Sequence, residues 1–266
     1  MCFTPIYKNN GVKHHKRQSL FSPSRRAWRR EHLAHPGHGF AGLTGWKRWL
    51  VDILLALIVV PPLIFVAYRF VPPPVTPLML IRVVQGHGLT KDWTPLSEIS
   101  PNLQRAVIAS EDARFCEHQG FDWVAVDRAM ERNARGGRRM LGASTISMQT
   151  SKNLLLWPAR NFLRKGLEVY LTVWLEALLP KERILELYLN EIEWGQGIYG
   201  AEAAARIYFG VSAAQLTPHQ AALMAAALPA PLKWRPDYPG AWMSGHARVI
   251  EARMNSISLG KDGPCP

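Results

Sequence analysis

One carboxylate in the sequence lies where apolar side chains are expected. Glu111 belongs to the segment ASEDARFCEHQG, residues 109–120. Residues three and four apart share a helix face, and the face of Glu111 would also carry apolar side chains: Val107, Ile108 and Phe115. Asp112 would lie about 100° further round. Burial raises the pKa of a carboxyl group toward neutrality, where a general base works best. The alternative is a glutamate at the edge of the core, whose head reaches water.

Cationic side chains follow further along the chain, with few acids close by: Lys152, Arg160, Arg164 and Lys165. Arginine forks and lysine point charges suit phosphate oxygens, so this set predicts a phosphate-binding site. The alternative is a basic helix face that is simply solvated. A second carboxylate, Glu168, recurs at four-residue spacing with Arg164, and ion pairing on a helix surface explains that spacing equally well.

The segment GASTISMQTSKN, residues 142–153, is rich in side chains that donate hydrogen bonds, among them Ser144, Gln149 and Asn153. Such donors suit sugars or phosphates. The alternative is the polar start of a helix with Ser144 as its N-cap.

The sequence contains no spacing typical of metal ligands, because CxxC and HExxH are both absent. Of the three cysteines, Cys116 and Cys265 could pair in an oxidising compartment, but the sequence does not decide whether they do.

The net charge of +12 is concentrated at the N-terminus. Residues 1–48 carry ten Lys or Arg and one acid, and the rest of the chain carries 22 basic and 19 acidic residues. The apolar segment 49–71 approaches the roughly 20 residues needed to span a bilayer. The positive-inside rule then places the tail, 1–48, in the cytoplasm, which argues against a nucleic-acid-binding role for it. Pro61 and Pro62 predict a kinked transmembrane helix.

The elements that must position these side chains are mainly helical. Residues 72–94 form a stalk and a membrane-proximal segment, in which 78–84 could be a short strand. Ser100 and Pro101 are typical of a helix start, and they begin the helix that carries Glu111. Further helices are expected at about 123–135, 161–179, 181–192, 200–210, 218–228 and 241–254, with a mobile basic loop at 135–144. The fold class is therefore mainly α, with at most a short strand or hairpin.

Five segments in this order resemble the peptidoglycan glycosyltransferases of family 51, above all the monofunctional biosynthetic transglycosylases of Gram-negative bacteria. They are EDARFCEHQGFD, GASTISMQTSKNLLL, RKGLEVYLTVWLE, KERILELYLNEIEWGQGIYGAEAAARIYFG and LTPHQAALMAAALPAPLKWRP, within about 95–235. The chain departs from the family pattern at Met148, where a glutamine is usual.

The resemblance implies a lysozyme-like, α-helical glycosyltransferase domain, 95–260, with a head and a jaw behind one N-terminal transmembrane helix. It implies polymerisation of glycan from lipid II, with lipid II and the growing strand as substrates and no nucleic acid. It also implies a single-pass protein of the cell inner membrane with a periplasmic catalytic domain. Other proteins of cell wall synthesis and division are expected as partners.

The resemblance also implies roles for particular residues. Glu111 would be the general base, and Lys152 and Arg160 would stabilise the leaving diphosphate, with Arg164 and Glu168 beside them. Glu168 could also hold a divalent cation, Mg or Mn. The donor would be oriented by three side chains: Ser144, Gln149 and Asn153.

Two other classes of protein compete with this interpretation. A hydrolase of the same fold could use Glu111 as an acid, but it would not need the cations, because its leaving group is a sugar hydroxyl. A non-enzymatic membrane scaffold would need neither Glu111 nor the cations.

Overall fold

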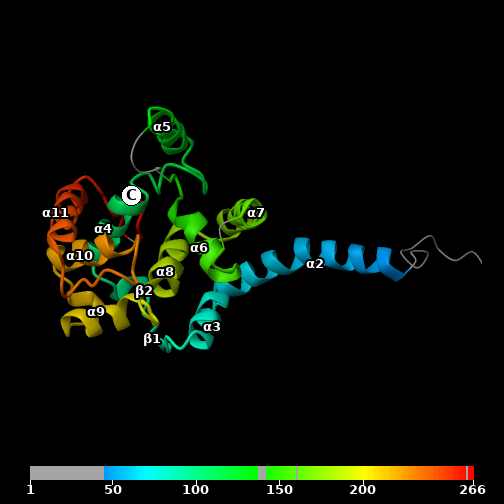
Figure 1. Ribbon diagram of the computed structural model, residues 1–266, viewed down its shortest axis with the longest axis horizontal. Coiled ribbons are helices and arrows are strands. Elements are labelled where there is room, and N and C mark those ends of the chain that lie inside the picture. The colour runs from blue at the N-terminus through cyan, green and yellow to red at the C-terminus, as the bar shows by residue number, and fades with distance from the viewer. Residues whose placement is uncertain (1–44, 137–141, 160, 262) are drawn as a thin grey trace, which may run out of the picture. The chain divides into compact units, whose positions relative to one another are not determined.

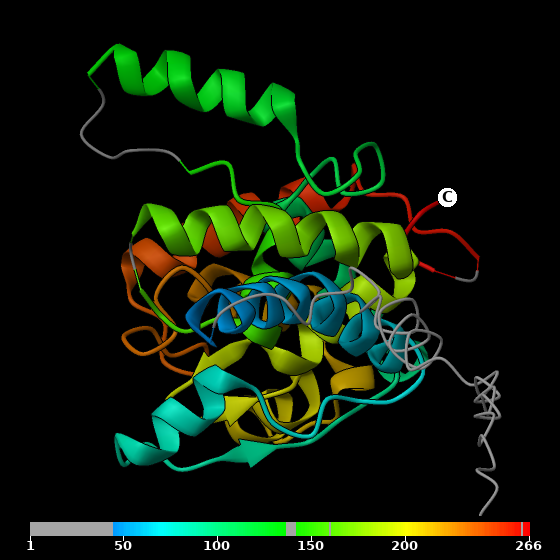
Figure 2. The same ribbon diagram turned by 90° about the vertical axis from the view of Figure 1, so that its right-hand side faces the viewer.

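The computed structural model describes residues 45–136, 142–159, 161–261 and 263–266 (Figures 1 and 2). The chain divides into two units, Met1–Leu54 and Leu55–Pro266. The described residues are mainly helical, which confirms the predicted fold class. Of the predicted site residues, Arg160 lies outside the described residues, as does half of the predicted loop 135–144, residues 137–141.

Helix α2, Gly45–Tyr68, is long and apolar enough to cross a membrane, as judged by length and composition. It begins and ends a few residues before the predicted segment 49–71, and it contains Pro61 and Pro62. Phe65, near the end of α2, belongs to the second unit and is fully buried in its core.

The segment 78–84 is a helix, so the expectation of a strand there is wrong. Helix α3, Pro77–Val84, begins after Thr76, whose hydroxyl accepts a hydrogen bond from the Met79 amide at 3.4 Å. Pro77 then occupies the first helical position, where its missing N–H costs nothing. An apolar run of this length does not by itself distinguish a strand from a buried helix, and the start signal decides it.

A small sheet has the strand order β1-β3-β2. Strand β1, Thr90–Lys91, pairs in parallel with β3, Ile198–Tyr199, and β3 pairs in antiparallel with β2, Glu193–Gly195. The β2–β3 hairpin matches the short hairpin that the sequence allowed, and β1 extends it by one strand.

Two groups of helices build the core of the second unit (Figure 1). Helices α4, Pro101–Glu111, α10, Pro218–Ala227, and α11, Ala241–Met254, pack on one another. Helix α6, Ile146–Leu155, packs between α7, Phe162–Leu178, and α8, Lys181–Glu191. Helix α5, Trp123–Ala134, stands off from both groups in both views (Figures 1 and 2), and α9 spans Ala201–Phe209. Short 3₁₀ turns lie at Leu96–Glu98 and Ala213–Gln215.

Helix starts read from local signals are confirmed. The Ser100 hydroxyl accepts from the Asn102 amide, and Thr217 and Gln220 form a capping box at the start of α10. Each cap satisfies amides that have no partner inside the helix, which is why short motifs locate these starts well.

Cys116 and Cys265 form a disulfide, with their Cα atoms 5.4 Å apart. The sequence left this pairing open. The bond joins the loop after α4 to a segment 149 residues further along the chain.

Replacing Cys265 with serine should lower the free energy of unfolding by about 2–4 kcal/mol, because the unfolded chain gains freedom when a long loop is opened. Chemical denaturation of the full chain in detergent measures the change. Cys2→Ser is the matched control and should have no effect. If neither Cys265→Ser nor added reductant changed the midpoint of unfolding, the result would contradict the disulfide.

Candidate active site

Glu111 is the last residue of α4, and a chain of two hydrogen bonds holds its carboxylate. The Gln149 amide nitrogen of α6 donates to Glu111 Oε2 at 2.8 Å. The hydroxyl of Tyr188, on α8, in turn donates to Gln149 Oε1 at 3.2 Å. Tyr188 is fully buried, so three helices together fix the position of the Glu111 carboxylate.

The pKa of Glu111 is raised above its ordinary value, and burial is the main cause. The hydrogen bond from Gln149 and the charge of Lys152 act in the opposite direction, and the charge of Asp112 adds to the increase. The predicted apolar neighbours Val107 and Phe115 are buried. A carboxylate whose pKa is raised accepts a proton more readily near neutral pH, as a general base must.

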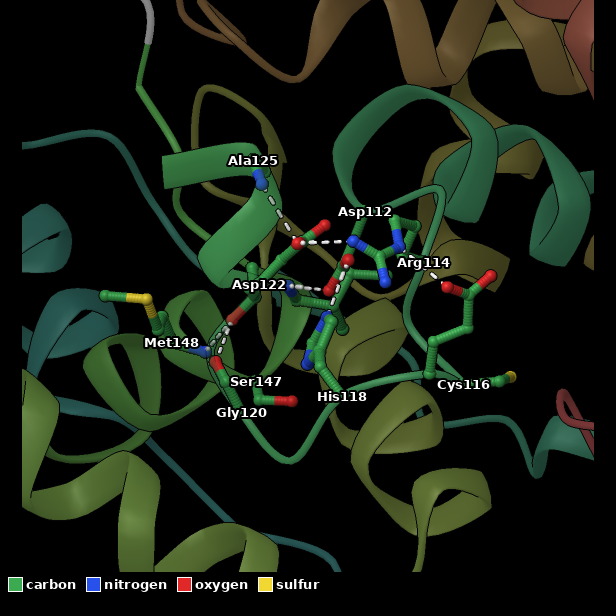
Figure 3. A network of polar contacts seen from close by, with 12 residues as sticks. Asp112, Arg114, Cys116, His118, Gly120, Asp122, Ala125, Ser147 and Met148 are labelled. Carbon is green, nitrogen blue, oxygen red and sulfur yellow. Dashed lines mark hydrogen bonds and ion pairs between the residues drawn. The ribbon is translucent and has the colours of Figure 1, made fainter. Parts of the chain in front are cut away.

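Asp112 is more buried than Glu111, which the helical pattern did not predict. The helix ends at Glu111, and Asp112 has φ −160° and ψ 70°, so the helical angle between the two side chains does not apply. Asp112 Oδ1 lies 2.9 Å from His118 Nε2, and Oδ2 accepts from the Ile146 amide at 3.0 Å (Figure 3). This amide is the first of α6, so Asp112 ties the end of α4 to the start of α6.

The loop after Glu111 is cross-linked by further polar contacts. Figure 3 shows Asp122 between Arg114 and the backbone of Ala125, at 3.2 and 3.0 Å. The Thr145 hydroxyl donates to the carbonyl of Gly120 at 2.6 Å. Gly120 has φ +87°, and a Cβ there would lie 2.8 Å from Thr172 Cγ2, so only glycine fits this crossing point.

Ser144 lies in the same pocket as Glu111. This pocket has a volume of about 230 Å³ and is also lined by the arginines Arg114, Arg128 and Arg253. Ser144 is exposed and does not cap α6: the cap is Thr145, whose hydroxyl accepts from the Met148 amide at 3.1 Å. Ser144 is therefore free to contact a ligand beside Glu111.

A second pocket, of about 460 Å³, brings together Lys152, Asn153 and Arg164. Arg82 of α3 also lines it, together with apolar side chains: Leu78, Leu156, Trp157, Pro158 and Ala159. Arg82 was missed because its segment was expected to be a strand. The sequence signal that indicates a helix there is the pair Thr76-Pro77, a typical helix start just before Arg82.

The charges around this second pocket are arranged about a buried carboxylate, Glu168. Arg164 Nη1 and Lys165 Nζ each lie 2.6 Å from a different Glu168 oxygen. Burial lowers the pKa of Lys152, and the charge of Glu168 partly restores it. The Lys152 ammonium makes no hydrogen bond or ion pair with the residues that the structure describes. The Nε of Arg164 is buried without a partner there, so both side chains have donors left for an anion.

The four-residue spacing of Arg164 and Glu168 continues along α7 to Thr172 and Glu176, and these last two side chains contact α6. Thr172 bonds to Ser151 at 2.9 Å, and Glu176 accepts a short hydrogen bond from Ser147. Both Glu168 oxygens are already used by cations, and no group of three or more His, Cys, Asp or Glu gathers among the described residues. These side chains do not fit a divalent cation at Glu168.

Comparison with known proteins identifies the family. The family model for transglycosylases matches residues 79–257, which is more than half of the chain. The chain belongs to the transglycosylase family. This match confirms the resemblance seen in the sequence, and it begins within α3, in the segment 72–94 that was expected to be a stalk and a membrane-proximal segment.

Several curated relatives are similar over most of their length, and all are named biosynthetic peptidoglycan transglycosylase. The relative from Caulobacter vibrioides is 53% identical over 215 residues, covering 79% of this chain and 93% of the relative. Those from Rhodospirillum centenum and Bdellovibrio bacteriovorus are 52% and 48% identical, covering 78% of this chain in both cases and 90% and 85% of the relatives. This transglycosylase is accordingly a peptidoglycan glycosyltransferase that makes glycan chains for the cell wall.

The contact between Gln149 and Glu111 predicts a pH effect. The amide of Gln149 stabilises the ionised carboxylate, so Gln149→Met should raise the pKa of Glu111 further. A base must be deprotonated, so the acidic limb of kcat/KM for glycan polymerisation should move to higher pH. Gln104→Met is the matched control, because Gln104 is a buried glutamine of α4, the helix of Glu111, and donates to the Leu96 and Ile99 carbonyls instead. An unmoved limb in Gln149→Met would mean that this hydrogen bond does not tune the base.

Proposed function

We propose that this transglycosylase polymerises glycan from lipid II by a single inverting displacement with Glu111 as general base. The observation that carries the proposal is the placement of Glu111, which has a raised pKa and is held by Gln149 beside a pocket open to a sugar. Glu111 takes the proton of the 4-hydroxyl of the acceptor lipid II. The oxygen forms a bond to the anomeric carbon of the donor chain, and the bond to the diphosphate breaks. One displacement converts the α linkage to β and releases undecaprenyl diphosphate.

The second pocket binds the diphosphate leaving group. The diphosphate gains negative charge as its bond to the sugar breaks, so a fixed cation stabilises the transition state more than the ground state. Lys152 and Arg164 line this pocket with unused donors, and Asn153 adds an amide. Arg160 would join them from outside the described residues. A hydrolase that releases a sugar hydroxyl would not need these cations, which favours the transferase over the competing hydrolase.

The other predicted residues take supporting roles. Glu168 contacts Arg164 and Lys165, so it acts as a positioning residue that holds these two cations in place. Gln149 orients Glu111 and could also contact the donor sugar, and Ser144 binds a sugar hydroxyl in the pocket of Glu111. The proposed steps assign no part to a divalent cation, because both Glu168 oxygens already contact cations, those of Arg164 and Lys165.

The location follows from the ends of α2. Helix α2 would cross the cell inner membrane once, with the basic tail in the cytoplasm and the catalytic domain in the periplasm. Two observations support this topology: the ten basic residues before position 49, and the Cys116–Cys265 disulfide, which requires an oxidising compartment. Lipid II in the same membrane would then reach the site at headgroup level. Partners among other cell wall synthesis and division proteins stay an expectation.

Glu111→Gln tests the proposed base, because the amide keeps the shape but accepts no proton. Turnover of lipid II into polymer should fall by roughly 10²–10⁴, while lipid II binding survives. Glu251→Gln is the control and should polymerise normally, because Glu251 is a half-buried glutamate of α11 that pairs with His219 and lines no pocket with Glu111. Near-normal polymer from the Glu111 variant, or cleavage of preformed glycan by the wild type without synthesis, would refute the proposal.

The topology can be tested with the cysteines that the chain already has. Cys116 and Cys265 are paired, so Cys2 of the tail is the free thiol. In sealed spheroplasts a membrane-impermeant maleimide should not label Cys2 until the membrane is permeabilised. A Tyr238→Cys variant is the positive control, because Tyr238 is highly exposed on the catalytic domain and should be labelled from outside. Labelling of Cys2 in sealed spheroplasts would reverse the proposed orientation.

A further inference from the structure

Arg82 is a cation of the leaving-group pocket that neither the sequence pattern nor the proposed mechanism uses. It comes from α3, which follows the transmembrane helix and packs on α6, the helix of Lys152. Arg82 lines the same 460 Å³ pocket as Lys152 and Arg164. Three cations from three helices therefore surround one pocket.

The guanidinium of Arg82 is held by two contacts and has one nitrogen to spare. Nε lies 3.1 Å from Oε2 of Glu193, a buried residue of β2, and Nη1 donates to Gln85 Oε1 at 2.9 Å. Nη2 makes no hydrogen bond with the part of the chain that the structure describes. A guanidinium that is held in place and keeps one free N–H donor is preorganised to bind an anion, because binding requires little reordering of the side chain.

Arg164, which also lines this pocket, is held in the same way. Its guanidinium pairs with the buried Glu168, just as Arg82 pairs with the buried Glu193. Each carboxylate fixes one arginine, and Lys152 has no such partner among the residues that the structure describes. A long side chain held in this way loses less conformational entropy when it binds a ligand than a free surface arginine does.

The rest of the lining is apolar, which indicates what kind of anion fits. Leu78 of α3 and the residues Leu156, Trp157 and Pro158 line the pocket beside the cations. Trp157 is 42% exposed and Leu78 half-buried, so apolar surface remains for a ligand to cover. Inorganic phosphate or a free sugar phosphate would leave it uncovered. A diphosphate attached to a hydrocarbon chain would use both parts of the lining.

From this geometry we infer that Arg82 is a further diphosphate-binding residue, and that α3 supplies the pocket with both a cation, Arg82, and a contact for the first prenyl units, Leu78. The inference rests on the proposed function, whose leaving group is a polyprenyl diphosphate. Arg82 then stabilises the charge that develops as the sugar–phosphate bond breaks. The simpler alternative is that Arg82 only connects α3 to β2 through Glu193.

The experiment measures lipid II polymerisation and its inhibition by added undecaprenyl diphosphate, in full-length protein in detergent. Arg82→Gln should lower kcat by roughly ten- to a hundredfold with a smaller change in KM, because the contact strengthens in the transition state. Inhibition by undecaprenyl diphosphate should weaken by at least about tenfold, and inhibition by undecaprenyl monophosphate should weaken less. Arg82→Lys should recover only part of each effect, since an ammonium cannot bind Glu193 and a phosphate as a fork does.

Arg206→Gln is the matched control, because Arg206 also pairs with a glutamate, Glu202, but lies on α9 away from the pocket. It should keep wild-type kcat and wild-type inhibition. The inference is overturned if Arg82→Gln, below its melting temperature, resembles Arg206→Gln in kcat and in both inhibitions. If Arg82→Gln does not fold, Arg82→Lys decides the question, because it keeps a cation opposite Glu193: reduced kcat and weaker inhibition support the inference, and wild-type values overturn it.

Lys152→Ala, measured in parallel, separates this inference from the proposed function. If Lys152→Ala is impaired and the Arg82 variants are normal, the role of Arg82 alone is refuted. If Lys152→Ala is also normal, the pocket does not bind the leaving group, and the proposed function loses its second site as well.

Discussion

A hydrogen bond between a buried carboxylate and the first amide of a helix sets the geometry on which the site depends. Asp112 accepts from the Ile146 amide, so the residue after the proposed base is joined to the start of α6. A buried carboxylate is costly without partners, and Asp112 has both this amide and His118. The N-terminus of a helix also carries partial positive charge, which favours an anion at that point. The side chains of α6 are thereby held in defined positions relative to Glu111.

Helix α6 in turn separates the two halves of the proposed reaction. Gln149, near its middle, reaches Glu111 and Tyr188, while Lys152 and Asn153, one turn later, line the pocket with Arg164. Two of its other polar side chains, Ser147 and Ser151, are buried against α7. Buried hydrogen bonds such as these can all form in only one relative position of α6 and α7. They therefore fix the position of α7 and of the cations on it. The proposed proton transfer and the proposed departure of the leaving group would thus take place at neighbouring points of one helix, α6.

The sequence alone could predict what depends on short-range chemistry. Caps such as Ser100 and Thr217 act within one helical turn, and their helices were located well. The apolar face of Glu111 was also readable, but its neighbour Asp112 was misplaced because the helix stops between them. The contact of Gln149 with Tyr188, and the approach of Arg82 to Lys152, join segments far apart in the chain. Such contacts depend on packing, which no local pattern records.

The disulfide has a consequence for the order in which the enzyme matures. Cys116 lies in the loop that follows Asp112, and its partner is translated 149 residues later. This bond can therefore close the loop beside Glu111 only after residue 265 has been synthesised and both cysteines have met in an oxidising environment. A nascent chain that stalls before Cys265 has no partner for Cys116 in this bond. Formation of the bond thus marks the point at which these two distant segments have been brought together.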